Sequence, residues 1–520
     1  MFTITIYYNG KTQNLQYQEP VLLSSALQEA GIPIKMLCAG RGTCGKCRVK
    51  AAGNLSDPTQ QEIKVLGEEL KQNIRLACMT KAEGDCQVTV ESQSMEIVTE
   101  GNQISVPVKP IGSGYGAAVD IGTTTVALYL YRLSDGSLLG KGAFPNPQSA
   151  YGADVISRIG AALEGKDAAL QNCIAAELEK QVANLCENHK VAFEELSTIV
   201  ITGNTTMLYL LMRENVKPLS CAPFEISEYY GSWIDVKALH WTMFPALRCY
   251  LPRTMSAFVG SDITCSLLAG NVLHEDGCTV LVDIGTNGEM GVHYQGRLVC
   301  CSTAAGPAFE GAGITMGSMA VPGAISKVWI ENEKIAFSTI GDAKAKGICG
   351  SGLIDALACF LTLGLIDETG YIDEEKADEA GYLAEYDDDA ALRIGDSDVL
   401  LTQKDVRSIQ LAKAAVCAGF LSLLNAVGLS AAQVDRLILA GGFGSFIDRT
   451  NAAVIGLIPK EFAQKAHSIG NASGSGASMI LLNSDCLAES EALAKQAEGL
   501  ELSSSAYFME QYVECMGFEV

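Results

Sequence analysis

Four cysteines near the start of the chain have the type and spacing needed to hold an iron-sulfur cluster. They are Cys38, Cys44, Cys47 and Cys78, a C-x5-C-x2-C loop followed by a distant fourth thiol. Two-iron clusters take four thiolates, three from one loop and one from farther along the chain, and the plant-type spacing C-x4-C-x2-C differs from this loop by a single residue. The spacing therefore predicts a 2Fe-2S cluster with these four ligands.

Other chemistries compete for the same loop. Residues 40–46 fit G-x-x-x-x-G-K, the start of a nucleotide-binding P-loop, but Cys47 stands where Ser or Thr must ligate magnesium. Zinc sites prefer two short C-x2-4-C pairs, and only Cys44 and Cys47 form one here. Four buried structural cysteines are the plain alternative. The cluster accounts for the spacing better than any of these.

An internal repeat forms a second candidate site. Residues 118–126 (AVDIGTTTV) recur as residues 281–289 (LVDIGTNGE), which indicates two similar lobes facing each other. In each copy an apolar strand runs into an aspartate, and the glycine after it lets the turn approach a phosphate that amides and hydroxyls bind. The candidate phosphate-binding residues are Gly122, Thr123 and Thr124, then Gly285, Thr286, Asn287 and Gly288. Asp120 and Asp283 are placed to face a hydrated Mg²⁺.

A third segment completes a candidate ATP site. Residues 437–445 (LILAGGFGS) are an apolar strand running into a glycine-rich turn, as expected beneath an adenine ring. The turn residues are Gly441, Gly442, Phe443 and Gly444. A lone D-x-G-T turn would be weak, because ordinary hairpins use the same residues. The three segments together favour ATP binding.

Carboxylates near these segments are the candidate catalytic groups. Asp120, Asp283 and Glu289 are the first choices, and Glu289 or Glu310 is considered for orienting an attacking water. Asp262 follows Gly-Ser and is interpreted as an acid at a helix N-terminus, where it complements the dipole, in preference to a metal ligand.

Residues after 115 resemble the actin, Hsp70 and sugar-kinase (ASKHA) superfamily. Residues 120–125 look like its first phosphate motif, 283–289 like its second and 440–444 like its adenosine motif. The first ninety residues carry strands expected at 2–8 and 87–91 and a helix at 21–30. The expected fold is therefore an α+β ferredoxin-like 2Fe-2S domain followed by α/β actin-like, duplicated ribonuclease-H-like lobes.

A ferredoxin fused in front of such lobes resembles, more narrowly, the reductive activators of corrinoid-dependent proteins. The resemblance implies that one electron from a reduced ferredoxin or flavodoxin passes through the cluster and converts Co(II) of a corrinoid protein in a methyltransferase system to Co(I). It implies ATP and Mg²⁺ as cofactors and is compatible with a homodimer. The chain departs from the longer activators, which carry an additional segment between ferredoxin and nucleotide domain.

Three alternatives stay open. An ATP-driven activator of another low-potential reductase or dehydratase shares the nucleotide fold. In activators of that kind, however, the cluster is expected to be shared between two subunits, without an N-terminal ferredoxin. A small-molecule kinase would leave the four cysteines unexplained. A non-catalytic electron carrier that senses nucleotide belongs to a different class, and ATP turnover with a corrinoid partner separates it from an enzyme.

The chain of 520 residues is predicted to divide into a cluster domain (1–91), a linker (92–114), a first lobe (115–275) and a second lobe (276–520). Residues 368–389 are acidic and are interpreted as a solvated surface excursion. The net charge of -23 argues against nucleic acid and anionic membranes as partners. We expect a cytoplasmic protein, because no signal peptide is evident, residues 409–429 fit a buried helix, and the 18 cysteines lack a disulfide framework.

Overall fold

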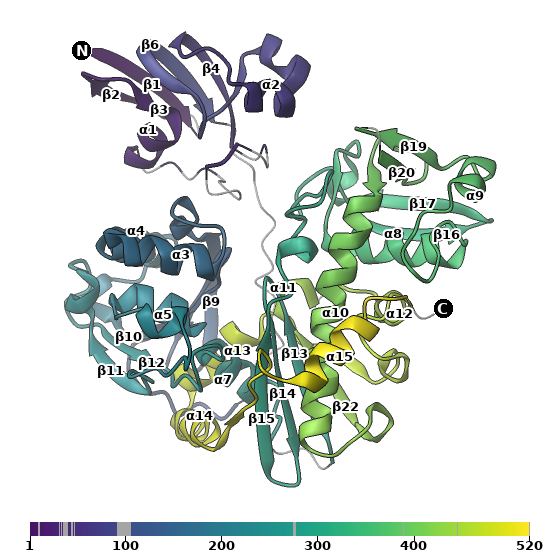
Figure 1. Cartoon of the computed structure of the whole chain (residues 1–520). Coiled ribbons are helices and arrows are strands. Elements are labelled where there is room, and N and C mark those ends of the chain that lie inside the picture. The colour runs from purple at the N-terminus through teal and green to yellow at the C-terminus, as the bar shows by residue number, and fades with distance from the viewer. Residues whose placement is uncertain are drawn as a thin grey trace.

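The computed structural model contains a small N-terminal sheet domain and two larger lobes (Figure 1). It describes residues 1–8, 11–30, 32, 34, 40–42, 45, 47–90, 106–273, 277–387, 389–444 and 446–518. The predicted linker lies partly outside these residues, and the first lobe begins with a strand at Tyr115. The expected order of a ferredoxin-like domain and two actin-like lobes is confirmed.

The N-terminal domain is one sheet with two short helices. Its strands are β1 (Phe2–Tyr8), β2 (Lys11–Tyr17), β3 (Val21–Leu22), β4 (Arg48–Leu55), β5 (Ile74–Leu76) and β6 (Lys81–Val90), and its helices are α1 (Leu23–Glu29) and α2 (Gln60–Leu66). The strand order is β2-β1-β6-β4-β5. The helix predicted at 21–30 begins at Leu23 in the structure, because Val21 and Leu22 form β3 and pair with β6.

The first lobe is a six-stranded sheet of order β11-β12-β10-β7-β8-β9. Its strands are β7 (Tyr115–Ile121), β8 (Thr125–Arg132), β9 (Ser137–Pro145), β10 (Leu196–Gly203), β11 (Ser232–Asp235) and β12 (Arg248–Leu251). Its helices are α3 (Val155–Ala161), α4 (Asp167–Asn188), α5 (Thr205–Met212) and α6 (Lys217–Ser220). Strand β7 pairs with the antiparallel strand β8 on one side and with the parallel strand β10 on the other. The turn after β7 and the segment after β10 therefore lie at the same end of the sheet.

The second lobe repeats this arrangement, which confirms the duplication. Its sheet has the order β23-β22-β13-β14-β15-β24, with β22 parallel to β13. The strands are β13 (Thr279–Ile284), β14 (Gly288–Tyr294), β15 (Arg297–Thr303), β22 (Arg436–Ala440), β23 (Ala466–Ser468) and β24 (Glu498–Gly499). The helices outside its outer part are α10 (Gln403–Ala426), α11 (Gly441–Gly444), α12 (Arg449–Val454) and α15 (Ala506–Glu514).

An outer part of this lobe carries two small sheets. They are built from β16 (Ala324–Glu331), β17 (Lys334–Thr339), β18 (Gly347–Ile348), β19 (Leu383–Tyr386), β20 (Asp389–Arg393) and β21 (Leu400–Thr402), with helices α8 (Gly350–Thr362) and α9 (Glu374–Glu379). The interpretation of 368–389 as a solvated surface excursion is confirmed for most of its described residues, which are exposed, but the segment is also folded. This segment forms α9 and β19 and buries Ile372 and Ala377, because it completes the β19-β20-β21 sheet.

Two helices join the lobes. Helix α7 (Ser261–Ala269) and helix α13 (Ala472–Leu482) cross closely, since a Cβ on Gly476 would lie 2.0 Å from the carbonyl oxygen of Cys265. Although α13 lies between β23 and β24 of the second-lobe sheet in sequence, Ile480 and Leu481 share a core with Ala118 of the first lobe. Helix α14 (Ser484–Gln496) continues on the same side. Helices α13 and α14 therefore pack against the first lobe, and the chain then returns to the second lobe at β24.

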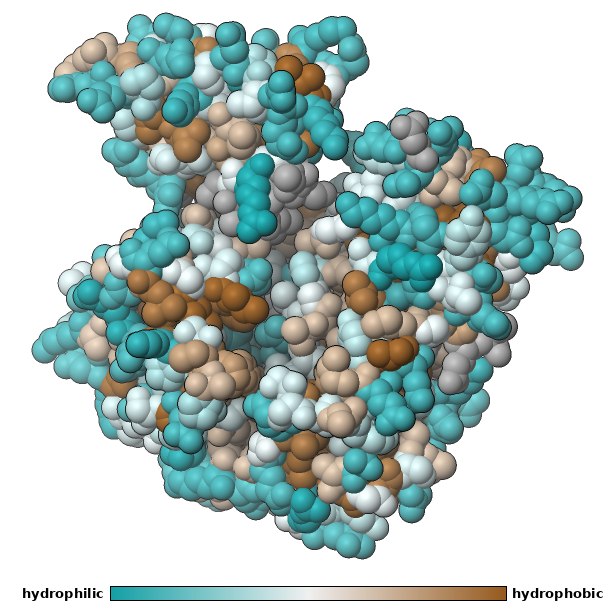
Figure 2. Space-filling model, in the orientation of Figure 1, coloured by the Kyte–Doolittle hydropathy of each residue, from teal (hydrophilic) through white to brown (hydrophobic). Residues whose placement is uncertain are grey.

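Helix α10 corresponds to the apolar segment predicted to be a buried helix. It runs from Gln403 to Ala426, beginning earlier than predicted behind a capping box at Thr402. Within the described residues it is the single helix whose length and composition would allow a membrane span, and 78% of its most apolar window is buried inside the lobe. That burial is typical of the core helix of a globular fold, and the face of the molecule seen in Figure 2 is mainly hydrophilic.

Candidate cluster and nucleotide sites

Two of the four predicted cluster ligands meet at one end of the N-terminal sheet. Strands β4 and β5 pair with Arg48 opposite Leu76, so Cys47 before β4 and Cys78 after β5 reach the same end. Their sulfurs are 3.2 Å apart and both side chains are buried. Tetrahedral ligands with metal-sulfur bonds of about 2.3 Å have sulfurs about 3.8 Å apart. The pair fits two thiolates sharing one iron, and Cys38 and Cys44 lie outside the described residues.

A buried carboxylate fixes the turn that carries Cys78. Glu62, on α2, is fully buried and accepts hydrogen bonds from Arg75 Nε (3.0 Å) and Thr80 Oγ1 (2.8 Å) on either side of that cysteine. Since a buried charge is retained only when it is paired and hydrogen-bonded, this network holds both flanks of the turn in one arrangement. This network thereby positions Cys78 at the end of the sheet.

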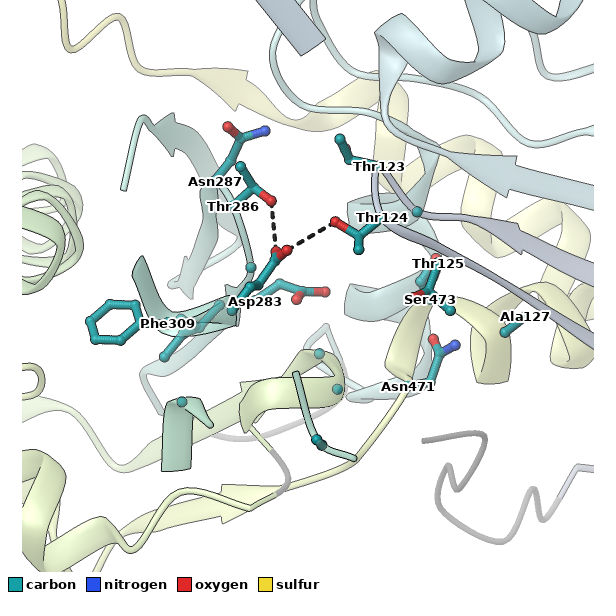
Figure 3. Close-up of a pocket in the computed structure, with 18 of the residues that line it drawn as sticks. Thr123, Thr124, Thr125, Ala127, Asp283, Thr286, Asn287, Phe309, Asn471 and Ser473 are labelled. Carbon is teal, nitrogen blue, oxygen red and sulfur yellow. Dashed lines mark hydrogen bonds between the residues drawn. The ribbon is translucent and has the colours of Figure 1, made fainter. Parts of the chain in front are cut away.

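The two repeated turns face each other across a cavity of ≈ 340 Å³ (Figure 3). Each turn is closed by a backbone hydrogen bond, from Gly122 N to Thr125 O and from Gly285 N to Asn287 O. Of the predicted residues, those that line the cavity are Asp120, Gly122, Thr123, Thr124, Asp283, Gly285, Thr286, Asn287, Glu289, Gly441 and Gly442. The structure thus brings segments far apart in sequence to one site.

Two predicted residues, Gly288 and Gly444, stand apart from the cavity lining. Gly288 is in β14, where an added Cβ would lie 2.7 Å from Thr303 Oγ1, and Gly444 is at the end of α11. The side chain of Phe443 lies outside the described part of the chain. Gly441 has φ +86°, and a Cβ there would lie 2.4 Å from Asp283 Oδ1, so the glycine lets the third segment approach the second phosphate turn.

Four carboxyl groups gather in the cavity: Asp120, Asp262 and Asp283, which are partly buried, and Glu289, which is buried. Burial raises the pKa of Asp120 to about 6 and, together with the charge of Asp120, that of Asp283 to about 7. Burial and the neighbouring aspartates also raise the pKa of Asp262 and of Glu289. So much negative charge in one place favours a cation.

These four carboxyl groups suit a divalent ion that keeps its water ligands better than an ion that several side chains coordinate directly. No group of three or more His, Cys, Asp or Glu side chains among the described residues is arranged to hold a metal. Mg²⁺ usually keeps several waters and binds through one or two carboxylates and the substrate phosphates. Asp120 also accepts from Ser473 Oγ at 2.9 Å, which fixes its orientation toward the cavity.

We expect the four carboxyl groups of the cavity to make the stability of the fold depend on pH. Carboxyl groups whose pKa is higher in the folded than in the unfolded protein bind more protons when folded, so stability falls as pH rises from about 4 to about 8. Without added nucleotide or Mg²⁺, the melting temperature should therefore be higher at pH 6 than at pH 8. Calorimetry of the wild type and Asp262→Asn tests this, since the variant should flatten the pH dependence. An equal slope in both proteins would contradict it.

Sequence reasoning missed or misjudged several residues of this site. Asp262 does begin α7, as interpreted, but its side chain also lines the cavity beside the two repeat aspartates. Asn471 and Ser473 enter the cavity from the start of α13, where no motif marked them (Figure 3). Asn204 caps α5, and its Nδ2 donates to Thr123 Oγ1 at 3.2 Å.

One carboxylate bridges the two phosphate turns. Thr124 Oγ1 of the first lobe donates to Glu310 Oε2 at 2.9 Å, and Thr286 Oγ1 of the second lobe donates to Glu310 Oε1 at 2.6 Å. These are the dashed contacts in Figure 3. The residue considered from sequence for orienting water is thus bonded to both of the turns predicted to hold phosphate.

The fold and these sites define a protein of the ASKHA class with an N-terminal 2Fe-2S domain. Family profiles match as a 2Fe-2S iron-sulfur cluster binding domain (6–83), the RACo middle region (115–275) and the C-terminal ASKHA domain of RACo (277–519). The corrinoid activation enzyme RamQ of Eubacterium limosum is 34% identical over 445 residues, 81% of this chain and 74% of that protein. The chain belongs to the family of RACo-type corrinoid activation enzymes.

Two further relatives extend the likeness. The [Co(II) methylated amine-specific corrinoid protein] reductase of Methanosarcina barkeri is 24% identical over 435 residues, 77% of this chain and 76% of that protein. A solved structure described as a reductive activator for corrinoid, iron-sulfur protein is 28% identical, with a TM-score of 0.73, and the match covers 100% of this chain and 98% of that one. The likeness therefore includes the N-terminal domain as well as both lobes.

Proposed function

We propose that this protein reactivates a corrinoid protein by passing one electron through a 2Fe-2S cluster to inactive Co(II), forming Co(I), in a reaction that depends on ATP and Mg²⁺. The observation that carries the proposal is the pair of sites in one chain: Cys47 and Cys78 at one end of a ferredoxin-like sheet, and two facing phosphate turns in the lobes. The relatives named for corrinoid activation and Co(II) reduction support the choice of acceptor.

The cluster would be held by Cys38, Cys44, Cys47 and Cys78 and would supply a one-electron carrier near about -400 mV, the range of plant-type ferredoxins. A reduced ferredoxin or flavodoxin is the proposed donor. The buried positions of Cys47 and Cys78 exclude water from half of the ligand set. The proposed acceptor is the corrinoid protein of a methyltransferase system in the cytoplasm, and the homodimer stays a prediction.

ATP is needed in this scheme because the electron moves uphill. Moving one electron across roughly 100 mV costs about 2.3 kcal/mol, so a gap of a few hundred millivolts needs several kcal/mol. A ligand that shifts a two-state equilibrium from 1:99 to 99:1 supplies about 5.5 kcal/mol. Nucleotide between Thr124 and Thr286 would bind both lobes at once, and closing them on the corrinoid protein would change the cobalt environment. Hydrolysis would then release the partner.

In this scheme the chain's carboxylates organise the phosphates. Asp120 and Asp283 would hold a hydrated Mg²⁺ against the phosphate chain, and the raised pKa of each means that the ion displaces protons when it binds. Glu289, buried beside them, is the proposed base for the attacking water. Gly441 and Gly442 would support the adenosine.

The proposal predicts Co(I) formation that requires ATP. An anaerobic optical titration would combine a purified Co(II) corrinoid protein, this chain and a low-potential reductant, with and without Mg-ATP. Co(I) absorbance should rise only with Mg-ATP. Equal reduction without nucleotide would favour the carrier that merely senses nucleotide, and absence of reduction with an intact cluster would point to another acceptor.

A further inference from the structure

Glu310 satisfies both threonine hydroxyls with the same two carboxylate oxygens. Each hydroxyl has one proton to donate, so Thr124 and Thr286 cannot bond Glu310 and a phosphate oxygen with that proton at the same time. The contacts are 2.9 and 2.6 Å, within the range of strong hydrogen bonds to a charged acceptor. A nucleotide phosphate that reaches these hydroxyls must therefore displace Glu310.

The backbone of Glu310 is held so that only its side chain can yield. It ends the 3-10 turn Pro307–Glu310, flanked by Gly306 and Gly311, which have φ +78° and +74°. Phe309 is buried, and Gly306 N donates to Thr286 O at 2.8 Å. An added Cβ on Gly311 would lie 2.5 Å from the carbonyl oxygen of Ser318. The carboxylate is thus carried by a rigid turn joined to the second phosphate turn.

The buried guanidinium of Arg158 favours a negatively charged group beside Thr124. Arg158 is fully buried, and its guanidinium donates to the carbonyl oxygens of Gly152 (2.9 Å) and Thr123 (2.7 Å). The described residues include no ion pair to it within 4.0 Å. Burial lowers the pKa of Arg158, and the charges of Asp154 and Glu310 are close enough to oppose that lowering. Because the Thr123 carbonyl belongs to the same peptide as the amide of Thr124, this charge favours an anion beside Thr124.

We infer that Glu310 is an internal competitor of the nucleotide's terminal phosphate. Its carboxylate ties the hydroxyl of Thr124 in the first lobe to that of Thr286 in the second, and the terminal phosphate of ATP takes over both hydroxyls and releases it. A diphosphate that stops short of these hydroxyls leaves the tie intact. The inference rests on the ATP binding in the proposed function and adds the group through which the protein distinguishes the two nucleotides.

Substituting Glu310 tests this on the full chain. In calorimetric titrations with Mg²⁺, Glu310→Ala should bind a non-hydrolysable ATP analogue at least fivefold more tightly than the wild type, with a less than twofold change for ADP. Glu310→Gln should fall between them, because it is neutral and only one of its two terminal atoms, the oxygen, can accept a hydrogen bond. Glu331→Ala, a substitution of an exposed glutamate in the same lobe, is the matched control and should match the wild type.

A second readout separates this tie from ATP binding itself. Spin labels on bioorthogonal residues at the exposed positions Leu138 and Lys334 report the distance between the lobes without nucleotide. Glu310→Ala should broaden or lengthen that distance without nucleotide, whereas the ATP analogue, which binds both lobes, should narrow it again in the variant. Unchanged analogue affinity and unchanged lobe distance, with ATP binding intact, would overturn the competitor role. Failure of the wild type to bind either nucleotide would overturn the proposed function, and the competitor role with it.

Discussion

Replacing Cys47 by alanine should abolish cobalt reduction while leaving nucleotide binding intact. The thiol is buried with its sulfur 3.2 Å from that of Cys78, and a 2Fe-2S cluster needs all four thiolates. The variant should lose the visible absorbance of the cluster and the rhombic electron paramagnetic resonance signal of its reduced form. Co(I) formation should drop to the rate seen without the protein, whereas titration calorimetry should give an unchanged affinity for the ATP analogue.

Cys86 offers a control in the same domain. It is also buried, and it pairs with Gly53 near the far end of β4 from Cys47. Burial raises the pKa of its thiol to about 11, so it is a neutral core side chain. Cys86→Ala should keep the cluster and the activity apart from a modest loss of stability. Retention of the full cluster signal by Cys47→Ala would show that the ligand assignment is wrong.

Replacing Asp283 by asparagine should lower the rate of ATP-dependent cobalt reduction by about 100-fold or more, the size of effect expected when one preorganised electrostatic group is removed. The change keeps the shape of the side chain and removes one of the charges that would hold the hydrated Mg²⁺. Because burial raises the pKa of Asp283 to about 7, the neutral amide should also make the protein more stable at pH 8. Optical rate measurements and calorimetry report both effects.

A more stable but inactive variant would exclude misfolding as the cause. Asp355→Asn is the matched control, since Asp355 is a buried carboxyl of the same lobe whose pKa burial raises to about 6. It does not line the cavity, and it accepts from Asn451 Nδ2 at 2.7 Å. This variant should keep ATP-dependent activity. If Asp283→Asn reduced cobalt as fast as Asp355→Asn, the role of Asp283 in nucleotide chemistry would be refuted.

The predictions that succeeded rest on local patterns. The N-terminal strand at 2–8 follows from alternation of apolar residues, and the two lobes follow from one repeated strand and turn. Composition correctly predicted that most of the acidic segment at 368–389 is exposed, but it did not predict that the segment folds into α9 and β19. Its charge describes the exposed side, and the burial of Ile372 and Ala377 depends on strands that pair later in the chain. Composition alone cannot reveal that pairing.

The sequence by itself determined the cluster spacing, the two aspartates that end repeated strands and the glycine-rich turn predicted to support an adenosine. Each depends on residues close together in the chain, whose spacing sets their geometry. Only the tertiary structure decided that Asp262 joins those aspartates, that Ser473 orients Asp120, and that Glu310 binds hydroxyls from both lobes. These contacts join segments that no local pattern relates, and burial, which sets their pKa values and hydrogen bonds, exists only once the lobes have packed across α7 and α13.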